Sequence, residues 1–199
     1  ISDLLFTTEK SALANLQREG IDPARVEFVG NVMIDTLYRN LERAVPGSQT
    51  LGTTLPAYAV LTLHRPSNVD DPATLAGLLD TIGEINRSLP VVMPLHPRTR
   101  GNIEKFGLTA RLDGLHILPP VGYLEMLGLM RDAKLVLTDS GGIQEETTAL
   151  GVPCLTLREN TERPITLDEG TNTLVGADPA AIRAAFNDVM THGGKAGRI

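Results

Sequence analysis

The chain has 199 residues, of which 42% are hydrophobic and 21% charged, values typical of a protein that buries a core. This length fits one large or two small domains. The formal net charge of −6 and a sequence pI of about 5.2 argue against a nucleic-acid binder, which usually carries a basic face. No run approaches the ~18 apolar residues of a membrane helix, so we expect no membrane segment.

The single cysteine, Cys154, excludes an intrachain disulfide. It lies in the apolar run 152–155, so we expect a buried core residue. This cysteine usage is consistent with a reducing, cytoplasmic setting. The sequence opens with Ile1 rather than Met and shows no signal peptide, so we expect a piece of a longer protein.

Short apolar runs alternate with amphipathic stretches, a pattern typical of an α/β fold with a parallel sheet. In the first part of the chain, the pattern predicts strands at residues 4–6 and 26–29 and a helix over residues 33–44. Residues 46–56 contain two prolines and no apolar periodicity, which predicts a linker. We therefore expect one domain to end within residues 1–45 and another to occupy residues 57–199.

Residues 57–199 show a regular succession of βα units. Strands are predicted at 58–63, 91–95, 115–118, 135–138, 154–157 and 173–175, and helices at 72–88, 102–106, 123–131, 143–150 and 179–190. This succession predicts a Rossmann-like, doubly wound parallel sheet. In such sheets ligands bind outside the carboxyl ends of the strands, so the informative side chains should follow strands directly.

The strongest motif is Thr-Asp-Ser-Gly-Gly-Ile-Gln-Glu-Glu at residues 138–146, where a strand runs through a turn into a helix. Gly141 and Gly142 allow a ligand to approach the backbone, and the helix start offers unpaired N–H groups that suit a phosphate. Ser140 can donate its hydroxyl to a phosphate oxygen, or it can simply cap the helix. Glu145 and Glu146 are expected in the first turn, where negative charge suits the helix dipole. Helix capping and phosphate binding explain this motif equally well.

Three further polar segments follow predicted strands. His64 and Arg65 can meet a diphosphate or assist a leaving group, or they can form an exposed loop pair. The segment 94–100 carries His96, although its two prolines favour a simple turn. Arg163, in the segment 158–164, could reach a diphosphate from the side opposite Ser140. Because the four segments converge on one edge of one sheet, together they favour a binding site over separate solvated loops.

The sequence gives no sign of a metal or a nucleotide-cofactor loop. The four His and one Cys lack metal-ligand spacing, and neither a GxGxxG nor a GxxxxGK[ST] motif is present. No G-x-S-x-G elbow surrounds Ser140, which argues against a serine nucleophile. By helical spacing, Met126 is most simply a core residue. We expect neither a metal nor a cofactor.

These residues in this order resemble the non-hydrolysing UDP-N-acetylglucosamine 2-epimerases, enzymes of the GT-B fold. The resemblance covers nearly the whole chain and is most specific at residues 138–153, 160–164 and 169–172. It implies that residues 1–45 are the end of an N-terminal Rossmann-like domain with its connecting helix. It also implies that residues 57–199 form a C-terminal UDP-binding domain, truncated at its end, and that most of the N-terminal domain lies outside this chain.

The resemblance further implies a reaction and a set of roles. UDP-N-acetylglucosamine and UDP-N-acetylmannosamine would interconvert at C2 through elimination and re-addition of UDP, without a cofactor, in a homodimer of the full-length protein. The implied contacts are Ser140, Gly141 and Gly142 with the diphosphate, Glu146 with the ribose, His64 and Arg163 near the diphosphate and sugar, and Tyr123 and Met126 near the uracil. The family's proton-transfer carboxylates would lie upstream of this chain.

One motif departs from the family pattern. The family commonly reads His-Arg-Arg-Glu-Asn where residues 64–68 read His-Arg-Pro-Ser-Asn, so roles of the second Arg and the Glu do not carry over. Three alternatives stay open. A GT-B glycosyltransferase using a UDP-sugar would share the fold, but the segment 160–164 argues against it. A hydrolysing 2-epimerase would lack the Thr-Glu-Arg-Pro run, and the chain alone could be a UDP-binding module without turnover.

Overall fold

The structure is a computed structural model that describes residues 2–197, and the chain divides into two compact units, Ile1–Arg39 and Asn40–Ile199. The smaller unit contains β1 (Leu5–Thr7), α1 (Ser11–Arg18), the short 3-10 helix η1 (Pro23–Arg25), β2 (Val26–Phe28) and most of α2 (Val32–Leu41). β1 and β2 pair in parallel. Phe6 and Phe28 remain 64% and 52% exposed on this strand pair. Parallel strands are normally covered on both faces, whereas these two described side chains of the pair are open to solvent.

The segment expected as a linker contains structure. Within residues 46–56 lies the short helix α3 (Gly47–Leu51), which packs against α7 (Tyr123–Arg131). The Gly47 N–H donates to the Asp132 carboxylate at 2.8 Å, and the Val45 N–H donates to the Leu124 carbonyl at 3.1 Å. Because these partners lie about eighty residues away along the chain, local composition did not reveal them. The limits proposed for the domains remain a prediction.

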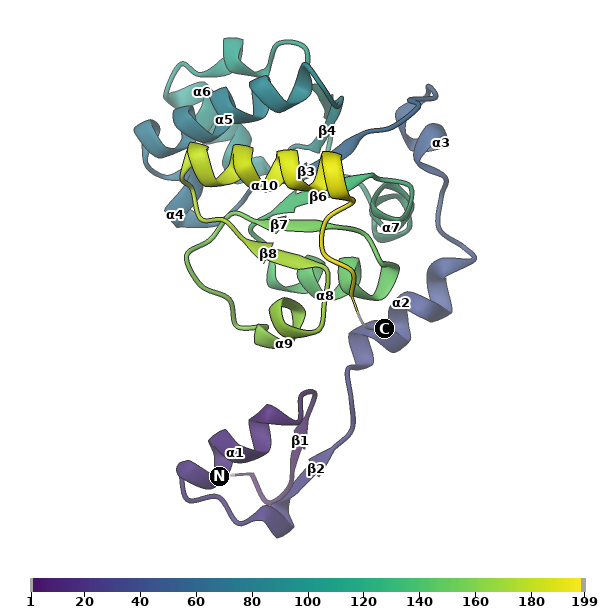
Figure 1. Ribbon diagram of the computed structural model, residues 1–199, viewed down its shortest axis with the longest axis vertical. Coiled ribbons are helices and arrows are strands. Elements are labelled where there is room, and N and C mark those ends of the chain that lie inside the picture. The colour runs from purple at the N-terminus through teal and green to yellow at the C-terminus, as the bar shows by residue number, and fades with distance from the viewer. Residues whose placement is uncertain (1, 198–199) are drawn as a thin grey trace. The chain divides into compact units, whose positions relative to one another are not determined.

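The larger unit is built on a six-stranded parallel sheet (Figure 1). Its strands are β3 (Ala59–Thr62), β4 (Val91–Pro94), β5 (His116–Leu118), β6 (Leu135–Thr138), β7 (Cys154–Thr156) and β8 (Asn172–Leu174). They lie in the order β5-β4-β3-β6-β7-β8, and every neighbouring pair is parallel. This is the doubly wound arrangement that the sequence predicted. The strand order reverses between β3 and β6, which makes the carboxyl ends of these two strands the switch point where ligands bind in such folds.

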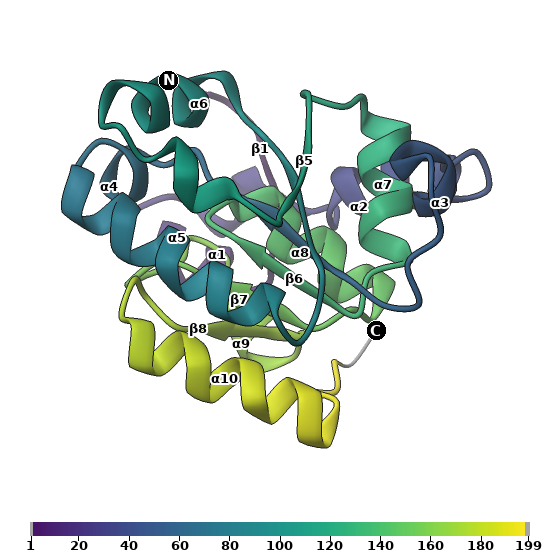
Figure 2. The ribbon, with the colours of Figure 1, turned by 90° about the horizontal axis from the view of Figure 1, so that it is seen from above.

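Helices cover both faces of this sheet (Figure 2). α5 (Pro72–Asn86) and α10 (Pro179–His192) pack on one face against inward residues such as Leu61 and Leu137. α7 and α8 (Gly141–Leu150) pack on the other face, against Val60 and Val136. Successive residues of a strand face opposite sides of the sheet, so neighbouring positions pack against the two helix layers. The strands are therefore runs of mostly apolar residues.

Most predicted elements are present, with shifted ends at some of them. α7 and β6 begin and end where the sequence predicts, and Cys154 is fully buried, as expected. α6 (Pro97–Lys105) begins five residues before its predicted start, because Pro97 suits the first helical position and the His96 ring accepts the Arg98 N–H. The short helices α4 (Pro66–Val69), η2 (Thr109–Leu112) and α9 (Pro164–Asp168) were not predicted. None of the helices within residues 2–197 has the length and apolar character needed to cross a bilayer.

Candidate functional site

The polar segments singled out in the sequence meet at the carboxyl edge of the sheet. His64 and Arg65 follow β3, and Asp139 and Ser140 follow β6, so they lie on the two sides of the switch point. Direct contacts join them, because the His64 Nδ1 lies 2.9 Å from the Asp139 carboxylate. The loop after β7 joins this group through Glu162, whose carboxylate lies 3.1 Å from the Arg65 guanidinium. The expected convergence of these segments is therefore present.

Asp139 is the centre of this arrangement, although the sequence reasoning gave it no role. Its fully buried carboxylate accepts hydrogen bonds from the backbone N–H groups of His64 (3.0 Å) and Arg65 (2.8 Å) and from the Asn68 amide (3.2 Å). Burial by itself would raise the pKa of Asp139, but hydrogen bonds from the His64 side chain and the two backbone N–H groups outweigh it and lower that pKa. Asp139 thus ties the loop after β3 to the end of β6. The feature of the sequence that could have identified Asp139 as a site residue was its position directly after a predicted strand.

The Ser140–Gly141 turn presents the start of α8 at this edge. Ser140 occupies the N-cap position, but its side chain makes no capping hydrogen bond, which removes the purely structural explanation of that residue. A side chain at Gly141 would collide with the Glu162 carboxylate, so an acidic group already lies against the turn. An anion is well placed at a helix start of this kind.

Glu162 is held over the turn by two cations. Its carboxylate lies 3.1 Å from Arg65 and 2.7 Å from Arg158. Burial would raise the pKa of Glu162, but its own backbone N–H, Arg158 and Arg65 outweigh this effect and lower it. The sequence reasoning assigned no role to Glu162. Arg158 lies four residues before it in the same loop, but Arg65 follows β3 and becomes its neighbour only in the folded sheet.

The acidic pair in α8 lies deeper than expected. α8 begins at Gly141, so Glu145 and Glu146 are in its second turn, and the expectation that they would complement the helix dipole in the first turn is wrong. The sequence placed the helix start two residues too late, because Gly141 and Gly142 look like a turn. Both glutamates are buried, with 6% and 7% exposure. Glu145 forms an ion pair with Arg163 at 3.2 Å.

Glu146 faces α7. Burial raises the pKa of Glu146; a hydrogen bond from the Tyr123 hydroxyl opposes this rise, and the Glu145 charge adds to it. The structure therefore brings Tyr123 and Glu146 together, and their contacts with the uracil and the ribose remain predictions. Met126, one turn further along α7, packs partly buried against the core beneath that helix. A buried carboxylate beside an exposed tyrosine can accept hydrogen bonds from ligand hydroxyls.

A buried amide network fixes the loop after β7. The Gln144 side chain donates to the Ser140 carbonyl at 3.1 Å and accepts from the Thr161 hydroxyl at 2.6 Å. It also accepts from the Asn172 amide at 3.1 Å. These bonds connect α8 to the loop that carries Arg163 and to the start of β8. These hydrogen bonds hold the loop after β7 in place at the edge of the sheet.

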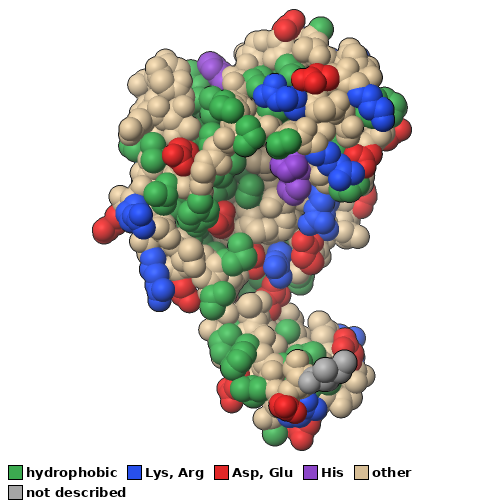
Figure 3. All heavy atoms as spheres, turned by 180° about the vertical axis from the view of Figure 1, so that it is seen from behind, with side chains coloured by type: hydrophobic (Ala, Val, Ile, Leu, Met, Phe, Trp, Pro, Cys, Tyr) green, Lys and Arg blue, Asp and Glu red, His purple; other side chains and the backbone are tan. Residues whose placement is uncertain are grey.

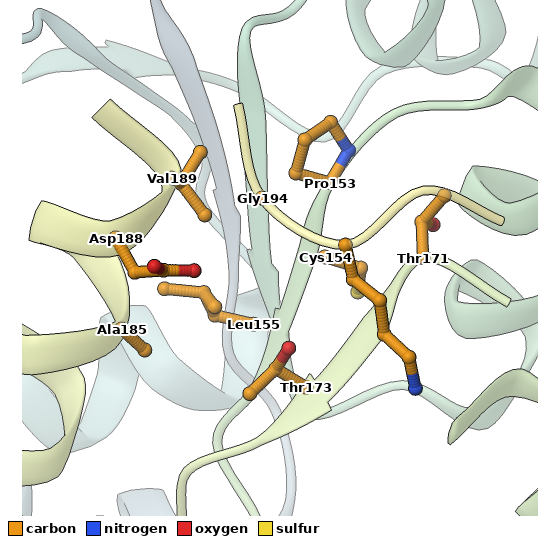
Figure 4. A pocket seen from close by; sticks show the side chains of 10 residues that line it. Pro153, Cys154, Leu155, Thr171, Thr173, Ala185, Asp188, Val189 and Gly194 are labelled. Carbon is orange, nitrogen blue, oxygen red and sulfur yellow. The ribbon is translucent and has the colours of Figure 1, made fainter. Parts of the chain in front are cut away.

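Two hollows flank the sheet. One, of about 600 Å³, opens at the carboxyl edge beside Arg65, Asn68 and Arg158. Figure 3 shows one face of the larger unit, on which histidine side chains lie beside Lys or Arg and Asp or Glu side chains. The other, of about 280 Å³, lies at the amino ends of β7 and β8 beside α10 (Figure 4). Cys154 lines it, but burial raises the pKa of that thiol to about 11, which makes it a poor nucleophile.

A parallel sheet of this strand order, with the Ser140–Gly141 helix start and a buried carboxylate at its switch point, is typical of a ligand-binding Rossmann-like domain. A protein-family model described as UDP-N-acetylglucosamine 2-epimerase matches residues 1–198. The chain therefore belongs to the UDP-N-acetylglucosamine 2-epimerase family.

Individual relatives agree with this membership. A UDP-N-acetylglucosamine 2-epimerase of Methanococcus maripaludis is 43% identical over 192 residues, which cover 92% of this chain and 52% of the relative. A UDP-2,3-diacetamido-2,3-dideoxy-D-glucuronate 2-epimerase of Pseudomonas aeruginosa is 41% identical over 181 residues, covering 89% of this chain and 49% of the relative. The chain thus spans about half the length of the curated relatives that it matches.

A solved structure extends the similarity to the fold. The UDP-GlcNAc 2-epimerase of Methanocaldococcus jannaschii, in complex with UDP-GlcNAc and UDP, superposes with a TM-score of 0.87 at 38% identity. The match covers 96% of this chain and 55% of that one. The α/β, Rossmann-like architecture is thus that of the GT-B epimerases, as the resemblance implied.

Proposed function

We propose that the full-length protein interconverts UDP-N-acetylglucosamine and UDP-N-acetylmannosamine by inverting C2 of the sugar, through elimination and re-addition of UDP. The observation that carries this proposal is the family match over residues 1–198. The site supports it, because the start of α8, a position that suits an anion, lies beside a buried carboxylate at the switch point. The solved relative that contains UDP-GlcNAc and UDP supports the same ligand class.

In this proposal the diphosphate lies at the start of α8. Ser140 donates its hydroxyl, and the backbone at Gly141 and Gly142 donates its N–H groups. His64 faces the diphosphate from the end of β3. Arg163 reaches it from the loop after β7, with its Nε paired to Glu145. These donors stabilise the negative charge that develops on UDP as the bond to the sugar breaks.

The nucleoside lies against α7 and α8 in the same proposal. Glu146 accepts hydrogen bonds from the ribose hydroxyls, and Tyr123 and Met126 lie near the uracil. The hydrogen bond between Tyr123 and Glu146 supports this placement, because it orients the carboxylate before the ligand arrives. The proton at C2 is removed by carboxylates that we expect in the part of the family chain beyond this sequence.

A second candidate substrate follows from the P. aeruginosa relative. Its name describes the same C2 inversion on UDP-2,3-diacetamido-2,3-dideoxy-D-glucuronate, and it is 41% identical, close to the 43% of the M. maripaludis enzyme. The family match argues against the glycosyltransferase. The hydrolysing epimerase stays the alternative reaction, and UDP binding without turnover stays the alternative for the chain alone. The homodimer and the cytoplasmic location remain predictions.

The test of this function is an assay on the full-length protein with each UDP-sugar in D₂O. We expect C2 inversion with deuterium incorporated at C2 and no accumulation of free sugar. Accumulating free N-acetylmannosamine and UDP would favour the hydrolysing reaction instead. Turnover of the diacetamido sugar alone would favour the second substrate, and no turnover of either sugar would contradict the proposal.

A further inference from the structure

We propose that Asp139 is a positioning residue that fixes the proton on His64, so that binding of a nucleoside diphosphate at this edge takes up a proton on the His64 ring. The inference rests on the proposed function, since it assumes that the diphosphate lies beside the Ser140–Gly141 turn. It assigns a role to Asp139 and predicts that a proton is taken up at that site when the ligand binds.

The contacts of Asp139 determine where the ring proton lies. Its carboxylate is fully buried, whereas the His64 side chain is 37% exposed, and the two meet at 2.9 Å through Nδ1. The remaining contacts of the carboxylate are all donors: the backbone N–H groups of His64 and Arg65 and the Asn68 amide. These hydrogen bonds hold the pKa of Asp139 below its ordinary value despite burial. An ionised carboxylate only accepts, so Nδ1 must carry the hydrogen.

This tautomer has a consequence for the ligand. When Nδ1 of a neutral imidazole carries the hydrogen, Nε2 presents a lone pair. A phosphate oxygen is also an acceptor, so the neutral ring cannot bond to it. A proton added at Nε2 converts the ring into a donor and places a positive charge beside the diphosphate. The buried Asp139 carboxylate stabilises that imidazolium, in the way an aspartate orients the histidine of a catalytic triad. The ring thus binds the departing diphosphate as a hydrogen-bond donor.

The other charged groups near this loop come from the loop of His64 itself and from the loop after β7. In its own loop, Arg65 donates to the Asp139 carbonyl and pairs with Glu162. In the loop after β7, Arg158 pairs with the same Glu162. These two cations share the single Glu162 carboxylate.

His96, in the loop after β4, supplies a built-in comparison. Its ring centroid lies 5.5 Å from that of His64, but its Nδ1 accepts the Arg98 N–H at 3.2 Å. A neutral His96 ring must then carry its hydrogen on Nε2. Two neighbouring histidines are thus expected to hold opposite tautomers.

The first arm of the test needs no ligand. Nitrogen-15 NMR of the imidazole rings in the chain at pH 7.5 should show the hydrogen on Nδ1 at His64 and on Nε2 at His96. In Asp139→Asn, the amide oxygen should take the backbone N–H groups and the amide nitrogen should face the ring, which moves the His64 hydrogen to Nε2. His96 should not change. A hydrogen on Nε2 of His64 in the unaltered chain, or an unchanged tautomer in Asp139→Asn, would overturn the role of Asp139.

The second arm measures the proton directly. UDP is titrated into the chain by calorimetry at pH 7.5 in buffers of different ionisation enthalpy, because the dependence of the measured heat on the buffer gives the number of protons taken up. We expect uptake of most of one proton in the unaltered chain and in His96→Gln. His64→Gln should abolish the uptake, and Asp139→Asn should reduce it at least twofold.

The two arms separate the possible failures. UDP binding without proton uptake would overturn this inference and leave the proposed function standing. No UDP binding by the folded chain would contradict the proposed nucleotide site, and the coupling with it. If Asp139→Asn does not fold, the His64 tautomer in the unaltered chain and the loss of uptake in His64→Gln still decide the matter.

Discussion

Two histidine–aspartate pairs in this chain have nearly the same contact distance and opposite surroundings. The His64 Nδ1 lies 2.9 Å from Asp139 at the carboxyl edge, and the His192 Nδ1 lies 3.0 Å from Asp188 on α10. Asp139 is fully buried, whereas the Asp188 side chain is 63% exposed. An exposed ion pair is screened by water and contributes little to the free energy of unfolding. A buried carboxylate is destabilising unless hydrogen-bond donors surround it. Burial, not distance, therefore distinguishes the site from the surface.

The same contrast holds for the arginine–glutamate pairs. Arg163 meets a Glu145 carboxylate that is 6% exposed, while Arg183 on α10 meets Glu84 on α5, which is 45% exposed. The carboxyl edge thus concentrates buried acids, and the α5–α10 surface carries exposed ones. If burial determines the strength of these interactions, matched substitutions in the two regions must differ in the size of their effects on stability and ligand affinity.

The largest difference is expected for the two aspartates. Asp139→Ala leaves several buried hydrogen-bond donors without an acceptor, so it should lower the free energy of unfolding by about 3–5 kcal/mol. Asp188→Ala should change it by less than about 0.5 kcal/mol. Urea unfolding of both variants measures this, and equal effects would break the comparison.

The next effect concerns ligand affinity. Glu146→Ala removes the proposed ribose acceptor and should weaken UDP binding by about 1.5–3 kcal/mol, the range for hydrogen bonds to a charged group. Glu84→Ala, at an exposed acid of the α5–α10 surface, is the matched control and should leave affinity unchanged. Calorimetric titration with UDP measures both, and an unaltered affinity in Glu146→Ala would remove the ribose assignment.

A smaller effect is expected in acid. The pKa of Asp139 is lowered by folding, so its contribution to stability is complete above the unfolded value of about 4 and is lost as the pH falls through the folded value. The stability difference between the unaltered chain and Asp139→Asn should not shrink from pH 7 to 5 and should shrink only below pH 4. Urea unfolding at stepped pH follows it. A difference that already shrinks between pH 6 and 5 would mean that burial raises this pKa.

The smallest effect is expected on the α5–α10 surface. Arg183→Ala breaks an exposed ion pair, which should cost less than about 0.5 kcal/mol and vanish at high salt. Thermal unfolding at low and high salt measures this. A loss above about 1 kcal/mol would show that exposure alone does not identify weak pairs in this chain.

The sequence predicted those parts of the molecule that depend on local pattern. Continuous apolar runs predicted the strands. The glycine pair that follows β6 predicted where the site begins. The partners of Asp139 could not be predicted, because Arg65 lies 74 residues away and becomes a neighbour only through the β3–β6 pairing. α3 was missed for the same reason, since its contacts are with α7. The depth of Glu146 also depended on where α8 begins, which the glycines obscured.

The most direct test of the nucleotide site is calorimetric titration of UDP into the folded chain, compared with Ser140→Ala and with Ser88→Ala at an exposed turn. The account predicts that UDP binds, that Ser140→Ala weakens binding about tenfold or more, and that Ser88→Ala leaves it unchanged. UDP binding that does not respond to Ser140→Ala would contradict the placement of the diphosphate at the start of α8.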